Sequence, residues 1–530
     1  MLSYRKLAMR VLGRPLHTGG IDSPRPASQR AAAFILTAAM LITLAAPAFA
    51  DIWHIENGDI SVKASGTKGK NTVSQGNKKD VEDTNTIITG TSDKNTVTID
   101  TSKGNVDVTF DDLNIDTSSR NKAAVSVTGE GDTNIKLDGD NALKSDIYRS
   151  GIYGSGSLTI SGGENDSLTA QGGSGANGIS SSGSLTISGG TVTANGDDGG
   201  RGISSSGSVT ISGGSTVTAN GGSGTISGGD GIWSGGGVTI SGGSTVTANG
   251  GNGGSLVGGD GIRSGGGLTV SDGTVTAKGG NGDSKDGYGG DGIRSGGVVT
   301  ISGNTVNAAG GYGGKVGGYG ICSFDRVAIS GGTVEAAGGN GSTGGGSGIY
   351  SSVIDLSGSL ELTAKAGSPT GKALLQNGRE LDLDTIKDKL GPGAKVTTTD
   401  ANGKTKEVSS PRPVEPEESS SSSDGGSAAP SAPASPLPGL TVTDKDGQRI
   451  SYTSTQSGNT LTVCVGRFTA SFRISLAALR QLRAEGIETI TFQTVLCSTT
   501  LSVDELLAMG GEDAEAVLTH RFTDSSLTVG

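Results

Sequence analysis

Residues 179–203 read ISSSGSLTISGGTVTANGDDGGRGI and contain one full repeat of this chain. A Gly-Ile pair opens the repeat, and two runs follow in which apolar residues alternate with threonine or serine, Leu185–Ser188 and Thr191–Ala194. Glycine and serine turns separate these runs. Strict alternation over four residues predicts short β-strands, whereas a helix would need a period of 3.6.

The same unit recurs along the middle of the chain. Its Gly-Ile pair returns at intervals of 24 to 31 residues, a period that is typical of solenoids. We therefore predict an all-β fold, a right-handed parallel β-helix in which each repeat forms one coil. Coils stacked about 4.8 Å apart would complete each other's backbone hydrogen bonds. The isoleucines of the pair are Ile152, Ile179, Ile203, Ile232, Ile262, Ile293, Ile321 and Ile349.

Alternation also predicts the core. Leu185, Ile187, Val192 and Ala194 should point inward, with Ile179 as a third short strand, while threonine and serine point outward. The 96 glycines of the 530 residues would permit turns with positive φ between the strands. The Gly-rich loop after the second strand varies in length, and solenoids often bind ligands on the face that carries such insertions.

The first 50 residues have the features of an export signal. Basic residues precede the apolar run Ala31–Ala46, and Ala48-Phe49-Ala50 provides small residues for cleavage, so Asp51 should begin the mature chain. The apolar run is shorter than the about 20 residues that span a bilayer. We expect an extracellular protein, secreted or held at the cell surface, with no membrane span after cleavage.

Composition divides the mature chain into four parts. Residues 51–150 should form an N-terminal cap and the first irregular coils, and residues 151–400 the Gly-rich repeats of the β-helix. Residues 401–439 are rich in proline and serine and are predicted to be a linker. Residues 440–530 predict a small C-terminal α+β domain, whose partner would be the cell wall or another protein.

Charge and histidine content exclude several functions. Residues 1–50 carry six of the 41 basic and one of the 52 acidic residues, which leaves the mature chain a formal charge of −16. Such a surface repels nucleic acid. Only His54 and His520 remain after cleavage, so a Ser-His-Asp triad or a multi-histidine zinc site is not expected.

Aligned on the Gly-Ile pair, the repeats form columns of residues. The position after the isoleucine holds Trp233, Arg263 and Arg294 on consecutive coils, and it should face outward. An aromatic ring can stack on a sugar ring, and arginine can pair with a carboxylate through two hydrogen bonds. This column is therefore a candidate site for an acidic polysaccharide, although such residues also occur as plain decoration of a solvent-facing surface.

A second column contains carboxylates. Asp230, Asp260 and Asp291 stand two residues before the isoleucine on consecutive coils, where like charges repel each other. Two compensating groups are open: a Ca²⁺ ion, which prefers such oxygen ligands, or the arginines three residues further on.

Three other features complete the pattern. Asn195, Asn220 and Asn249 predict a structural ladder of amides in the turns. The Thr-x-Thr runs of the second strand would form a flat face, suited to ice or to a polysaccharide, or simply to exposed strands. Cys464 and Cys497 share the C-terminal domain and would form either a disulfide or two free thiols.

Several segments together resemble a known family. Residues 105–115 (NVDVTFDDLNI), 123–127 (AAVSV) and 134–143 (NIKLDGDNAL), followed by the LTISG and GGTVTA repeats, are similar to the bacterial extracellular carbohydrate-binding domain with a right-handed parallel β-helix, of the clostridial pectin- and cellulose-binding type. The resemblance covers residues 52–400 and departs from the family in its glycine-rich loops. It implies binding of polygalacturonate or a related plant polysaccharide, association with calcium and a Gram-positive source.

We therefore expect a non-catalytic β-helix that binds an acidic polysaccharide outside the cell. A structural or adhesive surface protein without a glycan ligand is the alternative. A polysaccharide lyase is less favoured, because the repeats are too alike to show one specialised catalytic coil.

Overall fold

The computed structural model describes two units of the chain separately. In the first unit, which ends near Glu415, it describes residues 51–67 and 69–410. In the second it describes residues 439–444, 449–450, 452–457, 459–465, 469–494, 498–509, 514–521 and 524–529. The predicted signal at residues 1–50 and most of the predicted linker, residues 411–438, lie outside the described residues. No helix of the described part is long and apolar enough to cross a membrane.

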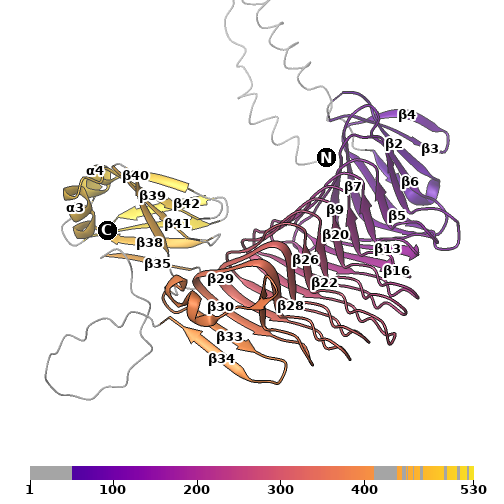
Figure 1. Ribbon diagram of the computed structural model, residues 1–530. Coiled ribbons are helices and arrows are strands. Elements are labelled where there is room, and N and C mark those ends of the chain that lie inside the picture. The colour runs from indigo at the N-terminus through magenta and orange to yellow at the C-terminus, as the bar shows by residue number, and fades with distance from the viewer. Residues whose placement is uncertain are drawn as a thin grey trace, which may run out of the picture. The chain divides into compact units, whose positions relative to one another are not determined.

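The first unit is a parallel β-helix, as the repeat predicts (Figure 1). Each coil contributes strands to three parallel ladders, and the last two full coils form single long strands that run through all three, β29 (Ile321–Ala337) and β30 (Ile349–Lys365). The ladder that starts at the Gly-Ile pair contains β2 (Ile60–Ala64), β6 (Val97–Asp100), β8 (Val125–Thr128), β11 (Ile152–Gly154), β14 (Ile179–Ser181), β17 (Ile203–Ser205), β20 (Ile232–Ser234), β23 (Ile262–Ser264), β26 (Ile293–Ser295) and β31 (Leu374–Gln376).

The other two ladders correspond to the two alternating runs of the repeat. The second ladder contains β1 (Ile52–His54), β5 (Thr86–Ser92), β7 (Val106–Asp116), β9 (Thr133–Asp138), β12 (Leu158–Ser161), β15 (Leu185–Ser188), β18 (Val209–Ser212), β21 (Val238–Ile240), β24 (Leu268–Val270) and β27 (Val299–Ile301). The third contains β10 (Asp140–Lys144), β13 (Ser167–Ser174), β16 (Thr191–Asp197), β19 (Thr216–Asn220), β22 (Ser244–Asn249), β25 (Gly273–Lys278), β28 (Thr305–Ala309) and β33 (Lys395–Thr399).

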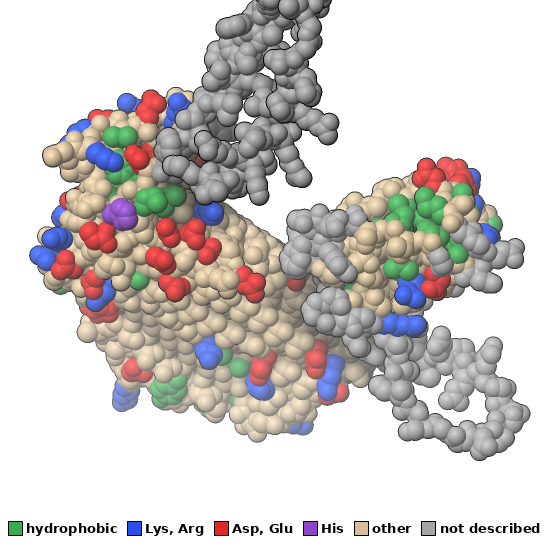
Figure 2. Space-filling model, turned by 180° about the vertical axis from the view of Figure 1, so that it is seen from behind, with side chains coloured by type: hydrophobic (Ala, Val, Ile, Leu, Met, Phe, Trp, Pro, Cys, Tyr) green, Lys and Arg blue, Asp and Glu red, His purple; other side chains and the backbone are tan. Residues whose placement is uncertain are grey.

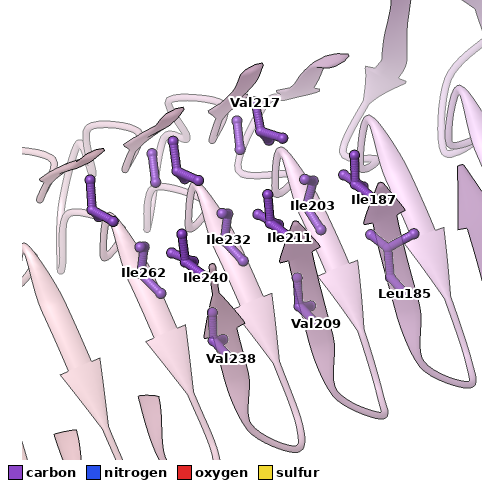
Figure 3. Close-up of a cluster of buried hydrophobic side chains, with 14 of the residues drawn as sticks. Leu185, Ile187, Ile203, Val209, Ile211, Val217, Ile232, Val238, Ile240 and Ile262 are labelled. Atoms are coloured by element: carbon purple, nitrogen blue, oxygen red, sulfur yellow. The ribbon is translucent and has the colours of Figure 1, made fainter. Parts of the chain in front are cut away.

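The core consists of small aliphatic side chains stacked from coil to coil (Figure 3). Leu185, Ile187, Val192 and Ala194 are all fully buried, which confirms the predicted inward face. The strand register places identical residues of neighbouring coils side by side: Ile187 pairs with Ile211, and Ile211 pairs with Ile240. Each coil alone buries too few such residues to be stable, so the stack is the unit of stability.

The Gly-rich loops are ordered, and their glycines do more than permit turns. Turn glycines such as Gly189 and Gly190 have positive φ, as expected. In the loops, the outgoing and returning arms of neighbouring coils alternate in one hydrogen-bonded series. Gly251 N donates to Gly229 O, Gly259 N to Gly251 O and Gly280 N to Gly259 O, each over 2.8 Å. A Cβ on Gly259 would lie 1.9 Å from Gly229 O, so these positions admit no side chain.

Both ends of the β-helix are closed by antiparallel hairpins, which protect the sheet edges. At the N-terminal end β2 pairs with β3 (Asn71–Gln75) and β3 with β4 (Lys78–Asp83), next to the 3-10 helix η1 (Ile55–Asn57). At the other end β31 pairs with β32 (Arg379–Glu380), the 3-10 helix η2 (Leu383–Lys389) follows, and β33 pairs with β34 (Thr405–Ser409).

This closing hairpin corrects one predicted boundary. The linker was expected to begin at residue 401, but β34 belongs to the β-helix unit through its pairing with β33. Its sequence is polar because four of its five side chains are exposed and only Val408 is buried. A strand that covers an end with one face in water lacks the apolar alternation of a core strand.

The second unit is a small α+β domain with two four-stranded sheets, as predicted in outline. One sheet contains β35 (Leu440–Thr443), β38 (Ala470–Ser475), β41 (Glu515–Arg521) and β42 (Asp524–Val529), and the other β36 (Thr453–Ser457), β37 (Thr460–Cys464), β39 (Thr489–Gln493) and β40 (Ser498–Ser502). The helices are α3 (Leu476–Ala484) and α4 (Val503–Met509), joined by an ion pair between Arg483 and Asp504. Cys497 lies outside the described residues, so the predicted disulfide with Cys464 stays a prediction.

Candidate functional site

The predicted outward column lies along a groove of the β-helix. The groove encloses about 690 Å³ and crosses several coils. Glycine backbone forms much of its surface, together with Val257 and the side chains of three arginines, Arg201, Arg263 and Arg294. Asp230 and Asp260 also line the groove. Four of the six residues predicted from the sequence line this groove: Arg263, Arg294, Asp230 and Asp260. The fifth, Asp291, pairs with Arg294, and the sixth, Trp233, contacts Arg201.

Strand register places the aromatic and basic residues in a single row. Trp233 on β20 is the ladder partner of Arg263 on β23, which in turn is the partner of Arg294 on β26. Successive rungs of a parallel sheet are about 4.8 Å apart, so this row runs along the axis of the β-helix. Arg263 keeps 48% of its side-chain surface exposed, and its guanidinium is therefore available to a ligand.

The three aspartates form a buried ladder directly beside this row. Asp230, Asp260 and Asp291 are each only 4–6% exposed. One carboxylate oxygen of each accepts a hydrogen bond from the backbone of the next coil: Asp260 N donates to Asp230, Asp291 N to Asp260 and Tyr319 N to Asp291, over 2.7–2.9 Å. Asn177 accepts from Arg201 N in the same way. The position is thus a structural side-chain-to-backbone ladder.

The second oxygen of each carboxylate faces an arginine. Arg294 Nε lies 3.1 Å from Asp291 Oδ2, and Arg263 Nη1 lies 4.0 Å from Asp260 Oδ2. These are the arginines three residues further on, one of the two compensating groups that the sequence left open. Asp230 is paired differently, because tryptophan follows it: Arg201 Nε, on the preceding coil, lies 3.2 Å from Asp230 Oδ2.

Arg201 is the site residue that the sequence reasoning missed. Its guanidinium carbon lies 4.6 Å from the centre of the Trp233 ring, so it occupies one face of the indole while it pairs with Asp230. The sequence did hold a signal, since Arg201 stands in the aspartate column two residues before Ile203. An arginine side chain is long enough to reach from its own coil to both Asp230 and Trp233 on the next coil.

The balance of charge in the groove favours anions. Burial, together with the neighbouring Asp291 and Asp230 carboxylates, raises the pKa of Asp260 to about 8. Burial also raises the pKa of Asp291, to about 6, although the Arg294 guanidinium opposes this shift. At neutral pH Asp260 is therefore largely protonated. Burial thus reduces the negative charge that Asp260 and Asp291 place beside Arg201, Arg263 and Arg294.

The same contacts bear on the predicted calcium site. Among the described residues, no cluster of three or more histidine, cysteine, aspartate or glutamate side chains converges as metal ligands do. Asp230, Asp260 and Asp291 lie side by side along the ladder, and their oxygens face backbone N–H groups and arginines. Calcium binding at these carboxylates stays a prediction.

Two further predicted columns remain, the asparagines of the turns and the Thr-x-Thr runs. Asn249 Nδ2 donates to Asn220 Oδ1 and Asn220 Nδ2 to Asn195 Oδ1, both over 2.8 Å, which confirms the amide ladder. The Thr-x-Thr runs are in register from β16 to β25. One face of the β-helix consists largely of backbone and small polar side chains, whereas acidic side chains gather toward its N-terminal end (Figure 2).

A second hollow lies on the earlier coils and is less suited to an anion. It encloses about 580 Å³, and its charged lining consists of Asp116, Asp146, Asp197 and Lys144. Lys144 is already paired with Asp116 at 3.5 Å.

Comparison of the chain with protein families, with curated proteins and with solved structures finds no match, so the candidate site rests on its own geometry.

Proposed function

We propose that this chain is an exported, non-catalytic protein that binds an acidic polysaccharide in the groove over β20, β23 and β26. The observation that supports this most is the row of guanidinium groups, Arg201, Arg263 and Arg294, in one groove of an otherwise acidic protein. Guanidinium groups pair with carboxylates through two parallel hydrogen bonds, which suits uronic acid residues. The resemblance to pectin-binding domains makes polygalacturonate the first ligand to test.

Trp233 has two roles in this proposal. Its ring holds Arg201 in place by a cation–π contact, and its remaining exposed surface is available to the apolar face of a sugar. Loss of the ring should therefore weaken binding in part by releasing Arg201. Because the side chain is half-buried at the surface of the β-helix, its loss should change stability little.

Titration calorimetry with polygalacturonate tests the proposal. Arg263→Gln should weaken binding by roughly tenfold or more, since a charge-assisted hydrogen bond contributes about 1.5–3 kcal/mol. Arg120→Gln is the matched control, because Arg120 is similarly exposed and lies on an early coil, paired with Asp93. Fully methyl-esterified pectin should bind weakly, since it lacks the charge.

Each other outcome points to a different function. Equal affinities for wild type and Arg263→Gln would refute the groove as the site. No binding to any acidic glycan would favour the structural or adhesive alternative. Release of unsaturated products from polygalacturonate would show a lyase and would overturn the non-catalytic assignment.

A further inference from the structure

The wall of the groove continues beyond the part already described. Val257 lines the groove, and Tyr288 and Val316 occupy the equivalent position on the next two coils, where they are its ladder partners. Residues in register on a parallel ladder point to the same side. Val257 is 41% and Tyr288 is 43% exposed. An apolar wall therefore follows the axis of the β-helix for three coils.

The column of Trp233, Arg263 and Arg294 forms the floor of the groove, and it also continues onto the following coils. After Trp233, Arg263 and Arg294, the same column holds Cys322 and then Tyr350. Tyr350 stacks on Tyr319, with ring centres 5.0 Å apart and an angle of 15° between the rings. The floor thus changes from basic on the middle coils to aromatic on β30.

A second exposed ring lies beside the basic part of the floor. Phe324 is 58% exposed, and the guanidinium carbon of Arg294 lies 5.6 Å from its ring centre. This contact joins the last arginine of the column to the aromatic region. Basic or aromatic side chains thus hold this column on β20, β23, β26 and β30, and on β29, where the column holds the buried Cys322, Phe324 supplies an exposed ring beside it.

Glycine pairs follow the wall on each of these coils. A pair of glycines stands between the two columns on each coil: Gly258-Gly259, Gly289-Gly290 and Gly317-Gly318. A Cβ on Gly289 would lie 2.0 Å from Gly311 O, and one on Gly317 would lie 2.0 Å from Gly339 O. These glycine positions therefore carry no side chain, and the side chains that stand between the glycines and the floor are the buried Asp260 and Asp291 and, on the third coil, Tyr319, which stacks on Tyr350.

We propose that the groove is the basic part of a longer binding strip, occupied by a linear chain of uronic acid residues that lies parallel to the β-helix axis from Trp233 to Tyr350. Arg263 and Arg294 bind its carboxylates, while Val257, Tyr288 and Tyr350 contact the apolar faces of its rings. Four rungs separate β20 from β30, about 19 Å at the usual strand spacing. The ligand is thus several sugars long. This inference rests on the proposed function and adds the direction and length of the ligand.

Calorimetric titration of the full chain with oligogalacturonates from dimer to hexamer tests it. Affinity should rise with length until the strip is filled. Tyr350→Ala should weaken hexamer binding about three- to tenfold and leave dimer binding unchanged, because only a long chain reaches both the arginines and Tyr350. Tyr153→Ala is the matched control: Tyr153 occupies the same column on β11, is 43% exposed and lies outside the strip. Tyr288→Ala provides a second variant, on the wall.

The outcomes separate this inference from the proposed function. If polygalacturonate binds and Arg263→Gln weakens it, but affinity is independent of oligomer length and of both Tyr350 and Tyr288, the groove binds a single residue and the strip is refuted. If neither oligomers nor polymer bind, the proposed function itself fails. An equal loss of affinity in Tyr153→Ala and Tyr350→Ala would also refute the strip.

Discussion

Replacement of one loop glycine should destabilise the β-helix far more than its position in a loop suggests. In Gly259→Ala the new Cβ would lie 1.9 Å from Gly229 O, whereas real Cβ contacts stay beyond 3.0 Å. One of the two arms must therefore move by about 1.1 Å. Gly259 N donates to Gly251 O and Gly259 O accepts from Gly280 N, both over 2.8 Å, so movement of this arm disrupts both bonds.

The size of the effect follows from these bonds. Each backbone hydrogen bond contributes about 0.5–1.5 kcal/mol net, and a buried group left without a partner costs about 1–3 kcal/mol. Loss of one or two bonds in the buried arm should therefore lower the free energy of unfolding by about 2–4 kcal/mol. Alanine restricts the unfolded chain more than glycine, but this gain of about 0.4–1 kcal/mol does not offset the loss.

Urea unfolding followed by circular dichroism measures the difference, with Gly154→Ala as the matched control. At Gly154 the nearest atoms to a new Cβ are 3.8 Å and 3.9 Å away, and its ladder partner is Ser181, so a side chain already fits in this column. The control should unfold at the wild-type urea concentration or slightly above it. If Gly259→Ala and Gly154→Ala unfold at the same concentration, close backbone packing is not the reason for glycine in the loops.

Two further predictions concern the buried aspartates. Asp260 keeps its proton in the folded state up to a pH of about 8, whereas an unfolded aspartate loses it near its ordinary pKa of about 3.9. Between these two values the folded β-helix binds more protons than the unfolded chain. Its thermal stability should therefore fall as the pH rises from 4 to 8. Asp260→Asn keeps an oxygen for Asp291 N and should be more stable than wild type at pH 8 and equal to it at pH 4; the same pH dependence in both proteins would refute this assignment. Calcium binding at Asp230, Asp260 and Asp291 stays a prediction, and calorimetric titration of the chelator-treated protein with Ca²⁺ tests it: a saturable heat that disappears in Asp260→Asn would establish the site, and the absence of any heat would refute it.

Local alternation was sufficient to predict the β-helix core. In a strand the side chain of every second residue faces the same side, so Leu185 and Ile187 had to share a face once the run was taken as a strand. The Gly-Ile pair then fixed the alignment of the repeats, and with it the ladder pairing of Trp233, Arg263 and Arg294. Register and facing follow from period and spacing alone.

Other features could not be derived in this way. The reach of Arg201 across to Trp233 depends on its rotamer, which no column encodes. The interleaved glycine arms have no apolar alternation, so hydrophobic periodicity cannot predict that they form a regular hydrogen-bonded structure. In the C-terminal domain composition predicts only the α+β class, although Ala470, Phe472 and Ile474 of β38 alternate as a buried face and its last residue, Ser475, caps the helix α3 that follows.

The glycine arms and the groove have a common physical origin. Because the arms of adjacent coils interleave, the backbone groups that form this series hydrogen-bond to one another and are not free for a ligand. In the proposed function recognition therefore comes from the columns on either side, where Val257, Tyr288, Arg263 and Arg294 stand. Substitution at these exposed positions leaves both the buried aliphatic stack and the glycine series intact. If the proposed function holds, ligand specificity can consequently change one coil at a time, without loss of the fold that aligns the coils.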